Sequence, residues 1–234
     1  MKVLILAGGF GYRMSEDTVK LPKPMVKIGN LPILEHIINF YISYGFEDFI
    51  VSGGYKYTVI KKYFQKHKNL RDKVKVINTG LKTQTGGRIK RAQHLLNKNE
   101  DFMVTYGDGL SNVNLDKLLK FHLKQDKIGT VTSVRPVARF GEIEIKNKHV
   151  VSFKEKPQVS YGWINGGFFI FKYSFLKYIN SAESVLEKQP LEALCKKKQL
   201  SAFQHSGFWQ CMDTRREKEF LDKLAKKRLL WKKK

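Results

Sequence analysis

A glycine-rich segment near the N-terminus carries residue types that bind phosphate. Residues 3–7 form an apolar run, typical of a short buried strand, that leads directly into three glycines within residues 8–11. Glycines after a strand let backbone N–H groups approach an anion, because no Cβ stands in the way. Arg13 and Lys23 add positive charge to the same part of the chain. The segment therefore predicts a nucleotide site.

Two common phosphate-binding loops do not fit this segment. The Walker A pattern G-x-x-x-x-G-K-[ST] does not occur in the chain, and Met14 stands where the dinucleotide fingerprint needs its third glycine. A tight turn without a ligand is the alternative for the glycines taken alone. Prolines flank Lys23 on both sides and restrict its backbone, so the lysine is presented to the site and the turn alternative loses weight.

Further motifs follow in order along the chain. They are T-G-G-R at 85–88, Y-G-D-G at 106–109, F-K-E-K-P at 153–157, N-G-G-F-F at 165–169 and G-F-W-Q-x-M-D-T at 207–214. Together with L-A-G-G-x-G-x-R and P-K-P-M near the N-terminus, they resemble the sugar-1-phosphate nucleotidyltransferases. Within that family they are most similar to the members that use CTP and glucose 1-phosphate. The resemblance spans nearly the whole chain.

The resemblance implies a reaction. A cytidylyl group would pass from CTP to α-D-glucose 1-phosphate by Mg²⁺-assisted in-line attack, giving CDP-glucose and pyrophosphate, an early step of CDP-sugar and deoxysugar supply for surface polysaccharide. The same chemistry with another nucleoside triphosphate or another phosphorylated acceptor is the alternative. A phosphate monoester is already an anion at neutral pH, so no covalent nucleophile is required. The enzyme must instead hold two repelling anions in line and neutralise charge.

The resemblance also implies roles for individual residues. Catalysis would rest on Arg13, Lys23 and Asp108. The nucleotide would be bound by Leu6, Ala7, Gly8, Gly9, Gly11, Arg13, Lys23, Thr85, Gly86, Arg88, Tyr106 and Gly107. The sugar phosphate would be bound by Glu155, Lys156, Asn165 and Gly166, and Mg²⁺ by Asp108 and Asp213. Because Mg²⁺ prefers oxygen ligands and keeps waters while bridging phosphates, two carboxylates suffice.

Several of these residues have a plainer alternative. Asp108 precedes a glycine, and Asp-Gly is a common turn pair. Arg88 only donates hydrogen bonds, which suits the acceptors O2 and N3 of cytosine, whereas uracil presents a donor at N3. A surface arginine at the start of a helix is the alternative for Arg88, and a core position is the alternative for Tyr106.

The sequence departs from the family pattern at three places. Tyr12 stands in the phosphate loop where the family usually has threonine. Leu21 replaces a lysine, which removes one charge near the site. The stretch between about residues 66 and 74 is shorter than in the glucose-specific members, whose extra segment is associated with subunit contacts. A homo-oligomer is therefore expected from the family but is not safely carried over.

Composition limits the class of protein. The chain has 234 residues, 42% of them hydrophobic, which is enough for one large α/β domain. No run of eighteen apolar residues and no signal peptide are visible, so integral membrane contact is not expected. Cys195 and Cys211 are the only cysteines and predict neither a disulfide framework nor a zinc site. A cytoplasmic protein is the resulting expectation.

The net charge of +23 first points to nucleic acid. A non-catalytic nucleic-acid-binding or regulatory protein is therefore the alternative of another class. The lysines are dispersed, however, which is typical of a solvated surface, and a positive field also attracts anionic substrates. The one dense cluster is the tail, residues 226–234, for which docking on the domain is favoured over contact with a membrane surface. No nucleic-acid partner is expected.

The order of elements predicts how these residues are positioned. Helices are expected over residues 32–44, 57–66, 88–96, 114–124, 174–179, 189–197 and 215–227. Strands are expected over residues 3–7, 49–52, 74–78, 102–106, 130–134, 141–145, 150–154, 166–171 and 200–205, with a hairpin tip at Lys148 and His149. Alternation of the two over the first half predicts a mainly parallel sheet flanked by helices.

The expected fold is a Rossmann-like α/β domain of the nucleotide-diphospho-sugar transferase type, with a mixed, mainly parallel sheet and a smaller antiparallel sugar-binding part. We expect one domain over residues 1–234, with a nucleotide-binding half to about residue 129 and a sugar-binding half from about residue 130. Ligands of open α/β sheets bind at the carboxyl ends of the strands. Residues 7–11, 78–87 and 106–109 should therefore meet in one crevice.

Overall fold

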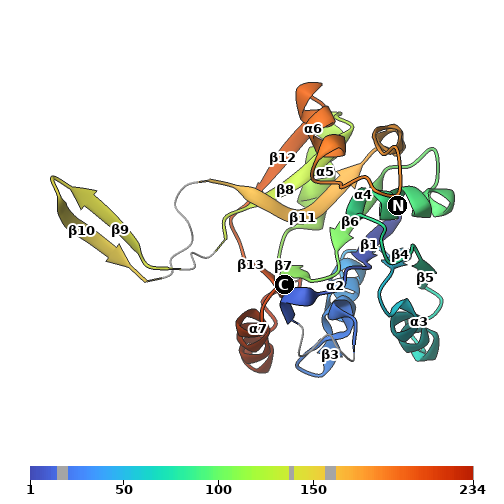
Figure 1. Ribbon diagram of the computed structural model, residues 1–234, viewed down its shortest axis with the longest axis horizontal. Helices are drawn as coiled ribbons and strands as arrows, with labels where there is room; N and C mark the ends of the chain where they lie inside the picture. The colour runs from blue at the N-terminus through green and yellow to red at the C-terminus, as the bar shows by residue number, and fades with distance from the viewer. Residues whose placement is uncertain (15–20, 137–139, 156–161, 234) are drawn as a thin grey trace.

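The computed structural model describes residues 1–14, 21–136, 140–155 and 162–233, and a seven-stranded sheet forms its centre (Figure 1). The strand order is β12-β8-β11-β6-β1-β4-β5. These strands are β1 (Val3–Ala7), β4 (Phe49–Gly53), β5 (Val74–Asn78), β6 (Phe102–Tyr106), β8 (Gly129–Val134), β11 (Ile164–Phe171) and β12 (Leu200–His205). The sheet is continuous across residue 129, where the two halves expected from the sequence meet.

The sheet is mixed and mainly parallel, which confirms the predicted fold class. Strands β6, β1, β4 and β5 run parallel, β11 is antiparallel to both β6 and β8, and β12 is parallel to β8. The helices are α2 (Ile33–Ile42), α3 (Tyr57–Lys66), α4 (Thr85–Ala92), α5 (Leu115–Gln125), α6 (Gln189–Lys196) and α7 (Arg215–Lys227). Short 3₁₀ helices are η1 (Tyr12–Met14), η2 (Lys23–Met25), η3 (Gln93–Leu95) and η4 (Tyr173–Tyr178).

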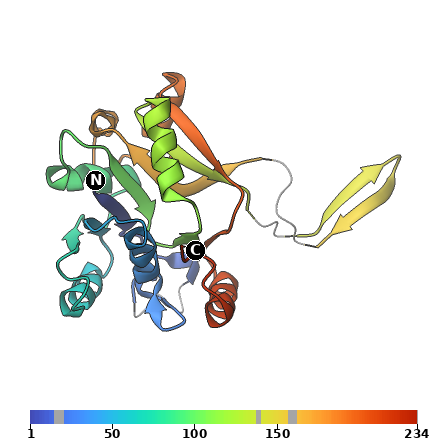
Figure 2. The ribbon, with the colours of Figure 1, turned by 180° about the vertical axis from the view of Figure 1, so that it is seen from behind.

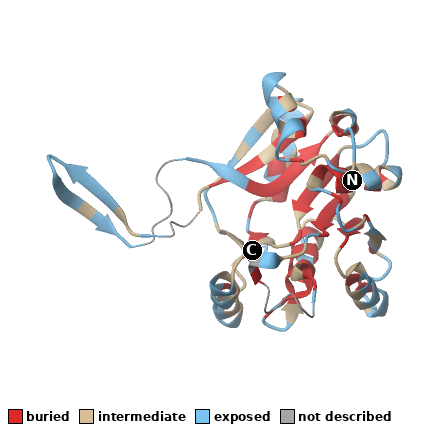
Figure 3. Ribbon diagram, in the orientation of Figure 1, coloured by how far each residue is buried: buried red, intermediate tan, exposed pale blue. Residues whose placement is uncertain are grey.

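Helices cover both faces of the sheet, and β1 shows why. Alternate side chains of β1 enter opposite cores: Val3 and Ile5 join the cluster under α2 and α3, while Leu4 and Leu6 join the cluster under α4 and α6. Every residue of β1 is buried, as is typical of a central strand covered on two sides, and the buried residues follow the sheet in Figure 3. None of the helices in the described ranges is long and apolar enough to cross a membrane.

Three small antiparallel pairs complete the fold. Strand β7 (Gly109–Ser111) pairs with β13 (Trp209–Cys211), and β2 (Lys27–Ile28) pairs with β3 (Leu31–Pro32). Strands β9 (Glu142–Lys146) and β10 (His149–Lys154) form a hairpin that projects from the body of the molecule in both views (Figures 1 and 2). The β7–β13 pair matters most for the site, because it joins two distant parts of the chain.

The tip of this hairpin lies one residue earlier than predicted. Asn147 and Lys148 have positive φ angles of 48° and 65°, as a two-residue turn with the right twist requires. Ile145 and Phe153 lie on the hairpin with more than half of their surface exposed, as do Ile143 and Val150. The hairpin thus carries an apolar face that the described residues leave open to solvent.

Helix α4 begins earlier than predicted. It starts at Thr85 and includes Gly86 and Gly87, whereas the sequence indicated a start at Arg88. A Cβ at Gly86 would lie 2.7 Å from the carbonyl oxygen of Ser184, and one at Gly87 would lie 2.1 Å from that of Ala182. The two glycines are therefore close-packing residues of a helix and not a turn before it.

The basic tail docks on the domain, as predicted. Trp231 is only 2% exposed, stacks near Phe208 at 5.9 Å between ring centroids, and donates a hydrogen bond from Nε1 to Nδ1 of His36 at 3.2 Å. His36 in turn donates from Nε2 to the carbonyl oxygen of Ile28 at 2.8 Å, the tautomer that both partners require. The tail is thus part of the core below β7 and β13.

Truncation of this indole should destabilise the protein. We expect Trp231→Ala to lower the free energy of unfolding by about 3 kcal/mol, because it removes a buried aromatic side chain and leaves a cavity. Urea unfolding followed by circular dichroism measures the change. Lys232→Ala, at the exposed neighbouring position, is the matched control and should stay within about 0.5 kcal/mol of the wild type. Equal effects of the two substitutions would contradict a docked tail.

Acidification should weaken the same contact. Burial lowers the pKa of His36 below its ordinary value, although the hydrogen bond to Ile28 and the charge of Glu35 raise it. Protonation of Nδ1 would also set two donors, His36 and Trp231, against each other. Because the folded-state pKa is the lower one, the unfolded state binds the proton first, and stability falls as pH drops below about 6.5. Unfolding free energies between pH 5 and 7 should show this slope, and His36→Gln should reduce it.

Candidate active site

Two adjoining pockets lie at the carboxyl ends of β1 and β6. The smaller has a volume of about 400 Å³ and is lined by Leu6, Ala7, Gly9, Gly11, Tyr12, Lys23, Pro24, Gly107, Asp108 and Asp213. The larger, about 760 Å³, is lined by Leu6, Gly8, Gly9, Phe10, Leu81, Lys82, Thr83, Gln84, Thr85, Arg88, Tyr106, Asp108, Asn165, Trp209, Cys211 and Asp213. Both volumes are typical of small-molecule sites. The segments around residues 7–11, 78–87 and 106–109 thus meet as predicted.

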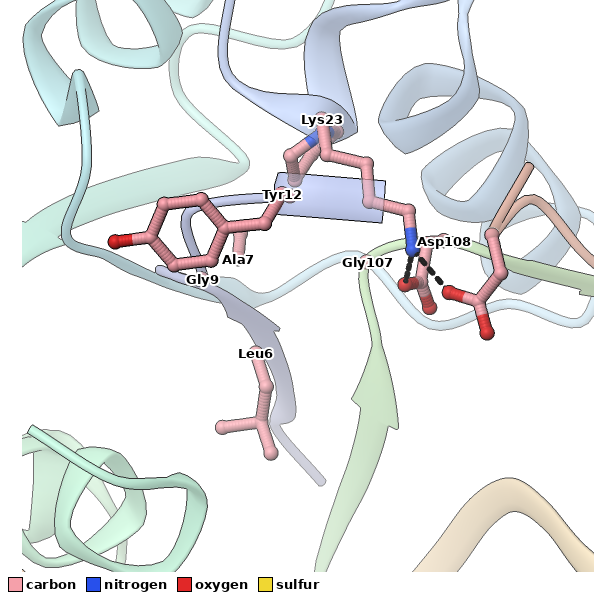
Figure 4. Close-up of a pocket in the computed structure, with 10 residues that line it drawn as sticks. Leu6, Ala7, Gly9, Tyr12, Lys23, Gly107 and Asp108 are labelled. Carbon is pink, nitrogen blue, oxygen red and sulfur yellow. Dashed lines mark hydrogen bonds and ion pairs between the residues drawn. The ribbon is translucent and has the colours of Figure 1, made fainter. Parts of the chain in front are cut away.

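Lys23 bridges two carboxylates in the smaller pocket. Its Nζ atom donates to Oδ2 of Asp108 at 2.6 Å and to Oδ1 of Asp213 at 2.5 Å, and the side chain is 12% exposed (Figure 4). Burial lowers the pKa of Lys23, but the charges and hydrogen bonds of the two aspartates outweigh it and hold the pKa above its ordinary value. The lysine is therefore charged at neutral pH, and it offsets the repulsion between the carboxylates.

The β7–β13 pair brings the two aspartates together. Asp108 follows β6 and precedes β7, Asp213 follows β13, and the backbone N–H of Met212 donates to the carbonyl oxygen of Asp108 at 2.8 Å. A capping box then fixes the start of α7: Glu217 Oε2 accepts from the backbone N–H of Asp213 at 2.6 Å and of Thr214 at 2.8 Å. Asp213 therefore has a rigid backbone on either side.

These two carboxylates are the metal-binding candidates. Both oxygens lie within 2.6 Å of one nitrogen, so a single cation between them can contact both. Among the described residues no cluster of three histidine, cysteine or acidic side chains could hold a metal ion. Two carboxylates with an open side nevertheless fit Mg²⁺, which takes its remaining ligands from water and substrate phosphates.

Arg88 lies beneath the glycine-rich loop. Its side chain is buried, with the residue 4% exposed, and Nη2 donates to the carbonyl oxygen of Gly8 at 2.9 Å. Nη1 donates to Oγ1 of Thr79 at 2.6 Å and to the carbonyl oxygens of Gly80 at 3.0 Å and Gly53 at 3.3 Å. The guanidinium thus ties together the ends of β1, β4 and β5. Reading of the cytosine base by Arg88 stays a prediction.

A carboxylate that the motifs did not reveal lies beside the larger pocket. Glu187 accepts hydrogen bonds from the hydroxyl groups of Thr85 and Tyr106, and Asn165 donates from Nδ2 to the Tyr106 hydroxyl at 3.1 Å. Glu187 lies in an irregular polar segment before α6, so neither periodicity nor a motif singles it out. Trp209, which belongs to the motif at residues 207–214 and has no predicted role of its own, donates from Nε1 to the carbonyl oxygen of Gly166 at 2.7 Å.

Not every predicted residue joins the pockets. The backbone of Arg13 lies in η1, but its side chain falls outside the described part of the structure, as does Lys156 entirely. Glu155 lies at the base of the β9–β10 hairpin beside Gly141 and lines neither of the two pockets. Gly86 lies in the first turn of α4, packed against Ser184, and lines neither pocket.

Tyr12 lines the smaller pocket and Cys211 lines the larger one. The ring of Tyr12, which is 77% exposed, lies at the rim of the smaller pocket and stacks on Phe10 at 5.1 Å between centroids, so the departure from threonine adds an aromatic wall (Figure 4). Burial, followed by the charges of Glu217, Asp213 and Asp108, raises the pKa of Cys211 to about 12. The Cys211 thiol is therefore protonated at neutral pH, and a protonated thiol is a poor nucleophile.

Comparisons with known proteins agree with this geometry. Residues 2–223 match the model of the family described as nucleotidyl transferase. The chain belongs to this family. It is 40% identical to a glucose-1-phosphate cytidylyltransferase of Salmonella typhimurium, over 97% of this chain and 96% of that one. The predicted family and enzyme class, nucleotidyl transfer to a sugar 1-phosphate, are confirmed.

Solved structures support the fold. HddC from Yersinia pseudotuberculosis is 26% identical and superposes with a TM-score of 0.76, over 96% of this chain and 99% of that one. A UDP-glucose pyrophosphorylase, solved with UDP-glucose, is 19% identical with a TM-score of 0.74, over 97% and 99%. At that identity the second likeness concerns the fold alone. This nucleotidyltransferase thus shares its mixed sheet, with helices on both faces, with these two solved structures.

Two neighbouring glycines of the loop should respond differently to alanine. A Cβ at Gly8 would lie 2.0 Å from Nη1 of Arg88, whereas one at Gly9 would meet no atom within 4 Å. We expect Gly8→Ala to cost about 1–3 kcal/mol of stability, because Arg88 must move, and Gly9→Ala to fold like the wild type. Thermal unfolding measures both. Gly9→Ala should nevertheless weaken nucleotide binding in calorimetry, and unchanged affinity would argue against close phosphate approach at this position.

Proposed function

We propose that this nucleotidyltransferase forms CDP-glucose and pyrophosphate from CTP and α-D-glucose 1-phosphate. The paired carboxylates with Lys23, set beside a glycine-rich loop, support the chemistry of nucleotidyl transfer. The choice of CTP and glucose 1-phosphate rests on the 40% identity to the Salmonella enzyme over almost the whole of both chains. This likeness is the observation that carries the substrate assignment.

The proposed reaction is a single displacement. An oxygen of the sugar phosphate attacks the α-phosphorus of CTP, a new P–O bond forms, and the bond to pyrophosphate breaks with its electrons on the leaving oxygen. No proton has to be removed from the nucleophile, because a phosphate monoester is already anionic at neutral pH. The protein therefore contributes alignment and compensation of charge, which are large effects in a preorganised site.

A divalent metal ion is general in this family, and we propose Mg²⁺ held by Asp108 and Asp213. When bound, the ion neutralises charge on the triphosphate and on the leaving pyrophosphate. Lys23 keeps the two carboxylates paired in the ligand-free protein, and in the complex its charge becomes available to the phosphates. Arg13 is the proposed second cation at the triphosphate.

The other site residues keep the roles that the family resemblance gives them. We assign the nucleotide to Leu6, Ala7, Gly8, Gly9, Gly11, Thr85, Gly86, Arg88, Tyr106 and Gly107, and the sugar phosphate to Glu155, Lys156, Asn165 and Gly166. Backbone groups of the loop would face phosphate oxygens. Asn165, at the rim of the larger pocket, would contact sugar hydroxyls.

The remaining expectations about partners and location stay predictions. They are a homo-oligomer, a cytoplasmic location, and the lack of nucleic-acid and integral membrane contacts. Light scattering of the purified protein measures the oligomeric state directly.

A pyrophosphate-release assay tests the proposed function. With glucose 1-phosphate and Mg²⁺, CTP should give at least a tenfold higher kcat/KM than ATP, GTP or UTP. Asp108→Asn and Asp213→Asn should each lower kcat by about 100-fold or more, the usual scale for the loss of a group that stabilises transition-state charge. Asp116→Asn, an exposed aspartate of α5, is the control and should keep full activity. No turnover with any of the four nucleotides and a panel of sugar 1-phosphates would refute the proposal.

A further inference from the structure

Glu187 connects two elements that line the larger pocket. Its Oε2 atom accepts from Oγ1 of Thr85 at 2.7 Å, and its Oε1 atom accepts from the hydroxyl of Tyr106. Thr85 opens α4, and Tyr106 ends β6. Both partners line the pocket, whereas Glu187 is exposed to solvent beside them and is not one of the lining residues. The carboxylate is thus placed to orient pocket side chains without lining the pocket itself.

In the hydrogen bonds of the Tyr106 hydroxyl, the phenol donates to Glu187 and accepts from Asn165. Burial, followed by the charge of Glu187 and the hydrogen bond to it, raises the pKa of Tyr106 well above its ordinary value, so its phenol keeps its proton. The phenol donates this proton in a hydrogen bond to Glu187. The phenol oxygen is then free to accept from Nδ2 of Asn165 at 3.1 Å. Oδ1 of Asn165 accepts from the backbone N–H of Gly167 at 2.8 Å, so both ends of the amide are fixed.

The backbone holds this arrangement tightly. Gly167 has φ of 79°, a conformation that favours glycine, and a Cβ there would lie 2.5 Å from Cδ2 of Tyr106. The Tyr106 ring is thereby held against β11, where Asn165 lies. On the other side, Oγ1 of Thr85 accepts from the backbone N–H of Leu186 at 2.8 Å, so its own proton is directed to Glu187.

We propose that Glu187 is a positioning residue for both substrates. Because it accepts the Tyr106 proton, it leaves the phenol oxygen as an acceptor for Nδ2 of Asn165, and together with the Gly167 N–H it holds the Asn165 amide in one orientation. Through Thr85 it also fixes the first turn of α4 beside the nucleotide. The proposal rests on the proposed function for the assignment of Asn165 to the sugar and of Thr85 to the nucleotide.

Kinetics of two variants and a control test this role. Glu187→Ala should raise KM for glucose 1-phosphate at least fivefold while kcat falls less than threefold. Glu187→Gln should lie between this variant and the wild type, because the amide keeps one accepting oxygen and replaces the other with an NH₂ group, which cannot accept. Glu183→Ala, at an exposed position of the same segment, should match the wild type. A fall in kcat with unchanged KM, or equal effects of Glu183→Ala and Glu187→Ala, would overturn the proposal.

A double-mutant cycle shows whether Glu187 acts through Asn165. In an Asn165→Ala background, the additional change Glu187→Ala should leave KM for the sugar phosphate within a factor of two, since the amide that it orients is gone. The same fivefold rise in both backgrounds would mean that Glu187 acts by another route and would contradict the proposal.

An NMR measurement reads the role without any substrate. The side-chain NH₂ signals of Asn165, assigned by their loss in Asn165→Ala, should shift in Glu187→Ala and stay in place in Glu183→Ala. Signals that stay in place in Glu187→Ala would overturn the positioning role even if the enzyme is active. A clear shift in a protein that turns over no sugar phosphate would instead support the positioning role and refute the proposed function.

Discussion

The ion pair of Lys23 with Asp108 and Asp213 is the interaction around which the site is organised. Two carboxylates this close repel each other, and in a partly buried pocket the repulsion is screened only weakly by solvent. A cation between them offsets this repulsion, and Lys23 supplies it in the ligand-free protein. Three elements bring these residues together. Strand β6 ends just before Asp108, the β7–β13 pair places Asp213 beside it, and η2, which follows Pro22, presents Lys23.

A second buried charge supports the glycine-rich loop of residues 8–11. Arg88 gives its donors to carbonyl oxygens at the ends of three strands, including Gly8 at 2.9 Å. A carbonyl that points inward to the guanidinium leaves the opposite face of the loop open toward the pocket. The requirement for glycine at position 8 then has a concrete cause, because a side chain there would occupy the space of the guanidinium. The loop and the ion pair thus form adjoining parts of one site at the same edge of the sheet.

Much of this could be predicted from the sequence, because long periodic segments and ordered motifs carry strong signals. Strands β1, β5 and β6 and helices α3 and α7 have the predicted bounds. The three-residue strands β7 and β13 were missed, since so short a pair is stabilised by its tertiary partner and leaves no periodic pattern. The start of α4 was wrong because Gly86 and Gly87 normally end helices, and only the contact with residues 182–184 explains them. Glu187 could not be found, because its role depends on two direct partners, Thr85 and Tyr106, and through Tyr106 on Asn165, all more than twenty residues away in the sequence.

With the metal site proposed above, Lys23 and a divalent metal ion would compete for the same two carboxylates. Titration of the protein with Mn²⁺, followed by water-proton relaxation, tests it most directly when wild type, Lys23→Met and Asp213→Asn are compared with and without CTP. Wild type should bind one Mn²⁺ tightly only when CTP is present, Lys23→Met should also bind it without CTP, and Asp213→Asn should bind it weakly in both cases. Equal Mn²⁺ affinity of wild type and Lys23→Met in the absence of nucleotide would contradict competition between Lys23 and the metal ion.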